Sequence, residues 1–140
     1  VIEQFEQEIQ LGIVKFKLPA KWPIVRCDVL KMSQVWQNLI GNSIKYRGKL
    51  DQVEIKIGTR VSGIWCECWI EDNGLGIPSL EGNRIFKPFI RLDDSMQGSG
   101  IGLATVARIL EAHKGIIRLD SGYHDGARFF MRWPHHVSTR

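Results

Sequence analysis

The placement of glycine suggests a site for a small-molecule ligand in this 140-residue chain. Of its 14 glycines, six lie in two clusters that flank a segment with two phenylalanines: Gly74, Gly76, Gly82, Gly98, Gly100 and Gly102. Glycine lets the backbone approach a ligand closely and adopt positive φ, so the two clusters predict a backbone gathered around one small molecule. Ordinary turns would explain either cluster on its own.

The string GSGIGL at 98–103 precedes a helical pattern, and the N–H groups and dipole at a helix start favour phosphate. The common phosphate motifs do not fit it. A dinucleotide fingerprint needs a third glycine where this chain has Leu103, and no P-loop Gly-Lys-Ser/Thr or kinase His-Arg-Asp loop is present in the sequence. A nucleotide site here therefore requires a different fold.

A carboxylate lies in an unusual place near the first glycine cluster. Ile64, Cys66, Cys68 and Ile70 alternate with polar and aromatic residues, and Asp72 falls in phase with this apolar face. A bare charge on the covered side of a sheet is expensive unless it is hydrogen-bonded. Asp72 is therefore a candidate ligand-binding acceptor; the alternative is a cap on the turn that begins with Asn73.

The elements that must position these groups follow from hydrophobic periodicity. Alternation predicts strands at 13–18, 53–61, 63–72, 116–119 and 127–133, with a short extended piece at 24–25. Helical spacing predicts helices at 1–10, 28–47 and 101–113, the second capped by Asp28 and followed by Gly48. One short helix is expected around 85–86 within the long irregular stretch 73–100, and loops of that length are usually functional. This order predicts an α/β fold, a two-layer α/β sandwich with a mixed, mostly antiparallel sheet and helices covering one face.

Composition excludes several classes of protein. The length fits one domain, the 44% hydrophobic content argues against wholesale disorder, and no apolar run approaches a membrane span. The net charge of +4 comes largely from Lys and Arg scattered beyond residue 105, which does not favour a nucleic-acid interface. The three cysteines suit free buried thiols in a reducing cytoplasm better than zinc ligands. The first residues are acidic and unlike a signal peptide, and the sequence has no initiator Met, so we expect a domain of a longer protein.

Four segments together resemble a known family: QVWQNLIGNSIKY (34–46), EDNGLGIP (71–78), RIFKPFIRL (84–92) and GSGIGLATV (98–106). In order and spacing they resemble the N box, first glycine box, F box and second glycine box of sensor histidine kinases. That superfamily also includes DNA gyrase, the ATP-driven chaperones and mismatch-repair ATPases. The resemblance covers 28–134 and implies the Bergerat fold and a cytoplasmic ATP-binding catalytic domain of a two-component kinase, with membrane anchoring of the parent protein left open.

The resemblance also implies a role for each matching residue. Asn42 would bind Mg²⁺, Lys45 and Tyr46 would approach the phosphates and sugar, and Asp72 would accept a hydrogen bond from the exocyclic amine of adenine. The implied ATP-binding set is Asn38, Asn42, Lys45, Tyr46, Asp72, Gly74, Gly76, Ile77, Phe86, Arg91, Gly98, Ser99, Gly100, Ile101, Gly102 and Leu103. From the residues alone, the two asparagines could also serve capping or hydration, Phe86 and Phe89 could be core aromatics, and Arg91 could be solvated. The lid at 93–97 is short beside many family members.

Asn38 favours phosphotransfer over hydrolysis. The gyrase and chaperone relatives carry a glutamate four residues before the Mg²⁺-binding asparagine, where this chain has Asn38, and an amide cannot act as a general base. The resemblance implies transfer to a histidine on a separate helical dimerisation domain of the same protein, which would serve a response regulator. None of the four histidines here lies in the acceptor motif of that domain. No catalytic residue is therefore assigned within this chain. An anti-sigma-factor-type serine kinase and a nucleotide-binding docking module are the alternatives.

The resemblance also sets expectations for organisation. Residues 1–12 are expected to end a linker helix from the dimerisation domain, residues 13–136 to form the ATP-binding domain, and 137–140 to be a tail. The isolated domain is expected to be a monomer that does not bind nucleic acid. Trp65 and Trp69 face away from the helix-covered side of the predicted sheet. They are expected either to pack across strands under a loop or the N-terminal segment, or to contact the dimerisation domain.

Overall fold

The computed structural model describes residues 1–77, 82, 84–87 and 102–135. A 3-10 turn, η1 (Ile2–Phe5), leads into the short helix α1 (Glu6–Gln10). The remaining elements are β1 (Val14–Lys17), α2 (Val29–Lys45), β2 (Val53–Ser62), β3 (Trp65–Asp72), the 3-10 turn η3 (Arg84–Phe86), α3 (Gly102–Ala112), β4 (Ile116–Leu119) and β5 (Arg128–Pro134). These elements confirm the predicted strands and helices. Residues 24–25, however, form no strand.

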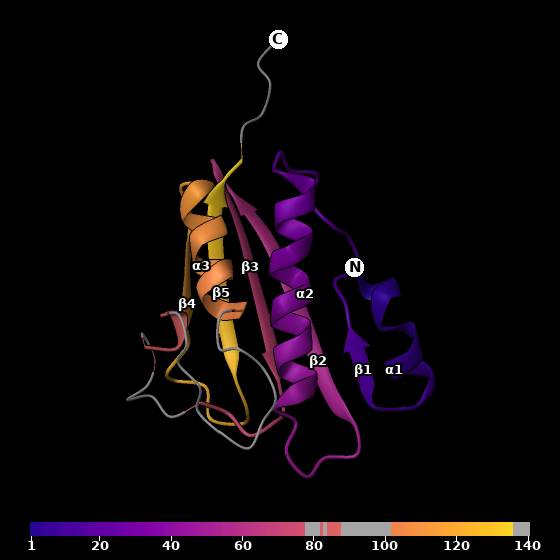
Figure 1. Cartoon of the computed structure of the whole chain (residues 1–140). Helices are drawn as coiled ribbons and strands as arrows, with labels where there is room; N and C mark the ends of the chain where they lie inside the picture. The colour runs from indigo at the N-terminus through magenta and orange to yellow at the C-terminus, as the bar shows by residue number, and fades with distance from the viewer. Residues whose placement is uncertain (78–81, 83, 88–101, 136–140) are drawn as a thin grey trace.

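The strands form one mixed sheet in the order β1-β2-β3-β5-β4. β1 is parallel to β2, and the other neighbouring pairs are antiparallel. The helices α2 and α3 lie side by side over one face of this sheet, with α1 beside β1 (Figure 1). The predicted two-layer α/β sandwich is confirmed.

The covered face of the sheet holds the hydrophobic core. Along β3, burial alternates from residue to residue, as expected when successive side chains point to opposite faces. Cys66, Cys68 and Ile70 are buried, and Asp72 continues the same row with 7% of its surface exposed. The alternation therefore brings a carboxylate to the covered side of the sheet.

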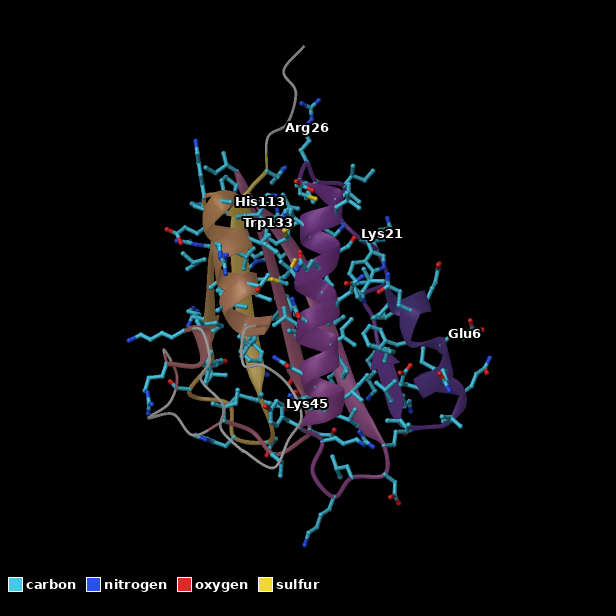
Figure 2. The ribbon with its side chains drawn as sticks, viewed as in Figure 1. Glu6, Lys21, Arg26, Lys45, His113 and Trp133 are labelled. Carbon is cyan, nitrogen blue, oxygen red and sulfur yellow. The ribbon has the colours of Figure 1, made fainter. Side chains whose placement is uncertain are left out.

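The two long helices are tied together at the end of the domain farthest from Asp72. Asp28 caps α2 by accepting a hydrogen bond from the Lys31 N–H at 3.1 Å. The Asp28 N–H in turn donates to Nε2 of His113 at 3.1 Å. His113 therefore carries its proton on Nδ1, which lies 2.8 Å from the Ile109 carbonyl. Figure 2 shows His113 and Lys45 at opposite ends of the helical layer.

The open face of the sheet carries the two tryptophans. The Trp69 indole lies against Gly58 of β2 and leaves no room for a Cβ there. The Arg132 guanidinium lies 4.3 Å from the centre of the Trp65 ring. Both rings therefore pack on neighbouring strands, as the cross-strand alternative predicted. In the part of the chain that the structure describes, no helix is long and apolar enough to cross a membrane.

Candidate functional site

The Asp72 carboxylate is held by two backbone N–H groups. Gly74 and Ala127 donate to Oδ1 at 3.0 Å and 3.2 Å. Among the described residues, Oδ1 accepts both of the hydrogen bonds donated to this carboxylate. These bonds leave Oδ2 as an acceptor for another group. The predicted turn cap and the predicted ligand acceptor are therefore compatible, because each uses a different oxygen.

The glycines after Asp72 pass close to other backbone segments. A Cβ on Gly74 would lie 2.6 Å from the Tyr46 carbonyl oxygen, which accepts a hydrogen bond from the Leu75 N–H at 3.0 Å. Gly76 has φ of 77°, and a Cβ there would lie 3.0 Å from the Gly126 carbonyl oxygen. These contacts place the Asp72 turn between the C-terminal end of α2 and the β4–β5 connection.

The C-terminal half of α2 brings the amide and cationic candidates to the same region. Asn38, Asn42 and Lys45 are all partly exposed, and their spacing places them on one face of the helix. Asn38 faces Gly102 at the start of α3. Lys45 Nζ lies 5.3 Å from the centre of the Tyr46 ring, which directly follows the helix. The structure thus brings the N-box helix together with the first glycine box and the start of α3.

Some predicted site residues belong to the core, and others lie outside the described residues. Phe86 packs edge-on against Phe129, with ring centres 6.1 Å apart, so the core-aromatic alternative fits its contacts. Ile77 and Leu103 also pack against the core. The candidates outside the described residues are Phe89, Arg91, Gly98, Ser99, Gly100 and Ile101.

The β4–β5 connection supplies contacts to Asp72 that the sequence motifs do not include. The Tyr123 hydroxyl donates to the Asp72 carbonyl at 3.2 Å. The Asp72 N–H donates to the Ala127 carbonyl at 2.9 Å, and the Gly126 backbone lies against the Asp72 carbonyl. Pairing of β3 with β5 creates these contacts, so only the strand register could have indicated them.

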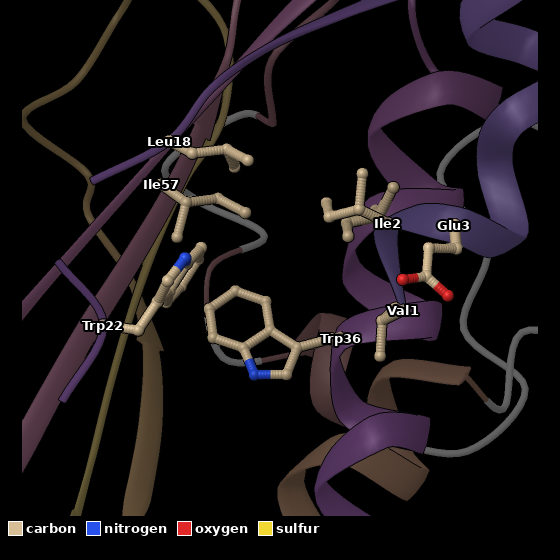
Figure 3. A pocket seen from close by; sticks show the side chains of 8 residues that line it. Val1, Ile2, Glu3, Leu18, Trp22, Trp36 and Ile57 are labelled. Carbon is tan, nitrogen blue, oxygen red and sulfur yellow. The ribbon is translucent and has the colours of Figure 1, made fainter. Parts of the chain in front are cut away.

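A separate cavity of about 330 Å³ lies on the side of α2 that faces the N-terminal segment. Its lining comes from the N-terminal segment, the loop after β1, α2 and β2: Val1, Ile2, Glu3, Leu18, Trp22, Trp36, Ile40 and Ile57. Figure 3 shows the Trp22 and Trp36 indoles next to each other, with the Glu3 carboxylate at the opposite side of the cavity. None of the predicted nucleotide-binding residues lines it.

The sequence of this chain matches a known protein family over most of its length. Residues 27–137 match the model of the histidine kinase-, DNA gyrase B- and HSP90-like ATPases. The chain belongs to this family. The match spans α2 and all the later elements, and therefore includes the whole Asp72 region of this ATPase-family domain.

The ATPase-family domain is similar to parts of longer signalling proteins. It is 37% identical over 120 residues to the methanogenesis regulatory histidine kinase FilI of Methanothrix harundinacea. It is 38% identical over 136 residues to the phytochrome-like protein Cph1 of Synechocystis. These alignments cover 86% and 95% of this chain but only 14% and 17% of the two relatives.

Solved structures show the same fold. The catalytic domain of the histidine kinase ThkA superposes with a TM-score of 0.81 at 26% identity, covering 95% of this chain and 86% of that one. The mycobacterial sensor histidine kinase MprB gives a TM-score of 0.79 at 23% identity, covering 98% and 92%. The fold is therefore that of histidine kinase catalytic domains, as the four sequence segments predicted.

Proposed function

We propose that this domain binds Mg-ATP and supplies the γ-phosphoryl group to a histidine on a separate helical dimerisation domain. The observation that carries the proposal is the Asp72 carboxylate, which is buried, fixed through Oδ1 and left with Oδ2 as an acceptor. The exocyclic amine of adenine is a donor that Oδ2 can bind, whereas guanine has a carbonyl at that position. Family membership supports a nucleotide as the ligand.

The residues on α2 fit the triphosphate and its metal. Among the described residues, no group of three His, Cys, Asp or Glu side chains could hold a metal ion. A neutral amide such as Asn42 suits Mg²⁺ that takes its other ligands from phosphate and water. Mg²⁺ would neutralise charge on the phosphates during transfer. Lys45 supplies a cation, and Tyr46 a hydroxyl, at the same end of the helix.

Phosphotransfer fits this chain better than hydrolysis. Asn38 lies one turn before Asn42 on α2, and its amide cannot accept a proton from an attacking water. His113 is engaged by Asp28 and Ile109 in the helical layer. The acceptor histidine is therefore proposed to lie on the dimerisation domain that residues 1–12 would join, and a response regulator would receive the phosphoryl group.

Calorimetric titration with Mg²⁺ and a non-hydrolysable ATP analogue tests the proposal. Wild type is expected to bind, and Asp72→Asn is expected to lose at least tenfold in affinity. The asparagine amide can keep an oxygen toward Gly74 and Ala127 only by turning its NH₂ group toward the adenine amine, where two donors meet. Arg60→Gln, on the open face of the sheet, is the control and should bind like wild type. An inert wild type, or an Asp72→Asn variant with unchanged affinity, would contradict ATP binding at this site.

A second experiment identifies the acceptor. The domain is mixed with labelled ATP and its dimerisation domain, and the phosphorylated product is treated with acid. Phosphohistidine is lost in acid and phosphoserine is retained. Acid-stable label would favour the serine-kinase alternative, and ATP binding with no transfer to any supplied partner would favour a docking module.

A further inference from the structure

We propose that Tyr123 and Arg128 are positioning residues for adenine recognition, because they hold the β4–β5 connection against the end of β3 and so orient Asp72. The inference rests on the proposed function and adds to it two residues outside the four sequence segments. Neither residue is expected to contact the nucleotide. Their effect passes through the backbone that fixes the Asp72 carboxylate.

The β4–β5 connection contacts Asp72 directly. The backbone of Ala127 makes two hydrogen bonds with Asp72: its N–H donates to the side-chain Oδ1 at 3.2 Å, and its carbonyl accepts from the Asp72 N–H at 2.9 Å. The Tyr123 hydroxyl donates to the Asp72 carbonyl at 3.2 Å. Gly126 lies so close to that carbonyl that no Cβ fits. The direction of the carboxylate therefore depends on where the connection sits.

Tyr123 is itself held in place by Arg128. The Arg128 guanidinium lies 4.4 Å from the centre of its ring, within the range of a cation–π contact. Arg128 forms ion pairs of 3.2 Å with both Glu71 and Asp120, and Asp120 accepts the Gly122 N–H at 3.0 Å. These contacts close the connection into a compact unit attached to the end of β3.

The Tyr123 hydroxyl stays protonated across the neutral range. Burial, followed by the nearby Glu71 charge, raises the pKa of Tyr123 to about 12. The phenol therefore remains a donor to the Asp72 carbonyl at any pH at which the protein would work. A phenylalanine ring keeps the packing under Arg128 but removes this donor.

Substituting Tyr123 or Arg128 is expected to weaken the binding of the adenine base and to leave the binding of the triphosphate unchanged. The direction of Asp72 Oδ2 matters for the adenine amine, whereas the triphosphate is proposed to contact other residues of the domain. Losing one hydrogen bond that fixes the acceptor corresponds to a weakening of about three- to tenfold. Inorganic tripolyphosphate has no base, and a guanine placed like the adenine would present its carbonyl instead of a donor to that acceptor, so the binding of these two ligands should not change.

The test compares Tyr123→Phe and Arg128→Gln with Arg60→Gln. Arg60 makes the corresponding ion pair with Glu67, at 3.0 Å, on the same face of the sheet but away from Asp72. Each variant is titrated with the Mg-ATP analogue, Mg-GTP and Mg-tripolyphosphate, with folding checked by circular dichroism. We expect both connection variants to bind the ATP analogue about three- to tenfold more weakly, with the other two ligands unaffected, and Arg60→Gln to match wild type.

Unchanged ATP affinity in both connection variants, or an equal loss for tripolyphosphate, would overturn the inference while leaving ATP binding in place. A wild-type chain that binds none of the three ligands would overturn the proposed function itself. If Tyr123→Phe fails to fold, Arg128→Gln carries the comparison, because it leaves the phenol in place and removes its support.

Discussion

Gly102, the first residue of α3, packs directly against Asn38 of α2: a Cβ at position 102 would lie 3.1 Å from the amide oxygen of Asn38. This contact joins the N-box helix to the start of the helix that follows the second glycine box. It also sets the spacing between two segments that are both proposed to face the nucleotide.

Gly102→Val is expected to destabilise the domain by about 1–3 kcal/mol, because the added methyl groups crowd Asn38. Removing the amide should relieve this crowding, so adding Asn38→Ala to the Gly102→Val variant is expected to recover part of the lost stability. Urea unfolding of the two single variants and the double variant measures the coupling energy between these positions. Additive losses would show that the two residues are not in contact in solution.

Asp72 is expected to contribute to stability as well as to binding. Asp72→Ala leaves the N–H groups of Gly74 and Ala127 without their acceptor, which should cost about 1–3 kcal/mol. Asp72→Asn keeps an oxygen in that position and should remain close to wild type in stability. Equal stability of the alanine and asparagine variants in urea unfolding would contradict the hydrogen-bonding role.

Asp120 gives a pH-dependent contribution. Its hydrogen bond from the Gly122 N–H, followed by its pairing with Arg128, holds the pKa of this carboxyl below its ordinary value. A lowered pKa in the folded state stabilises the protein above the unfolded pKa of about 3.9, and this contribution is lost as the pH falls through the folded pKa. Asp120→Asn should therefore be less stable than wild type at pH 7.

The difference in unfolding free energy between Asp120→Asn and wild type should begin to shrink below about pH 4, where the carboxyl of the unfolded chain takes up a proton while that of the folded protein is still charged. Urea titrations at pH 7, 5 and 3.5 measure this change. A difference that stays constant across the three pH values would show that the charge of Asp120 plays no part.

The three cysteines should differ sharply in reactivity. Cys66 and Cys68 are buried, with their sulfur atoms 4.0 Å apart, whereas Cys27 is half-buried. Burial, followed by the Asp28 charge, raises the pKa of the Cys27 thiol. Ellman's reagent should therefore label only Cys27 in the native protein, slowly and faster as the pH rises.

Unfolding in guanidinium without reductant should expose three free thiols, and Cys27→Ser should abolish native labelling. A count of one thiol in the unfolded wild type would reveal a Cys66–Cys68 disulfide instead. Rapid native labelling of Cys27→Ser would show that the sheet opens more readily than its buried thiols suggest.

Local patterns were enough to predict most elements of the fold. Asp28 is a capping residue directly before an amphipathic run, and it begins α2 as predicted. Alternation along 64–72 predicted that Asp72 lies on the covered face of the sheet, and β3 carries it there. The shared helix face of Asn38, Asn42 and Lys45 followed from their spacing. Each of these features depends on residues a few positions apart, and for that reason a single sequence reveals them.

Other features depend on residues that are distant in the chain. Ala127, which donates to Asp72, is 55 positions away, and Tyr123 is 51 positions away. Phe86 could be a core or a lid residue by its type, and only the position of Phe129 beside it places it against the core.

The sequence by itself determined that a buried carboxylate, an asparagine-bearing helix and two glycine clusters occur in an order typical of one ATPase family. The tertiary structure alone decided which oxygen of Asp72 is held and which is left as an acceptor. That choice depends on the pairing of β3 with β5 and on the connection held by Tyr123 and Arg128. Periodicity reports which face a side chain occupies, but the register between distant strands fixes the atoms that it meets.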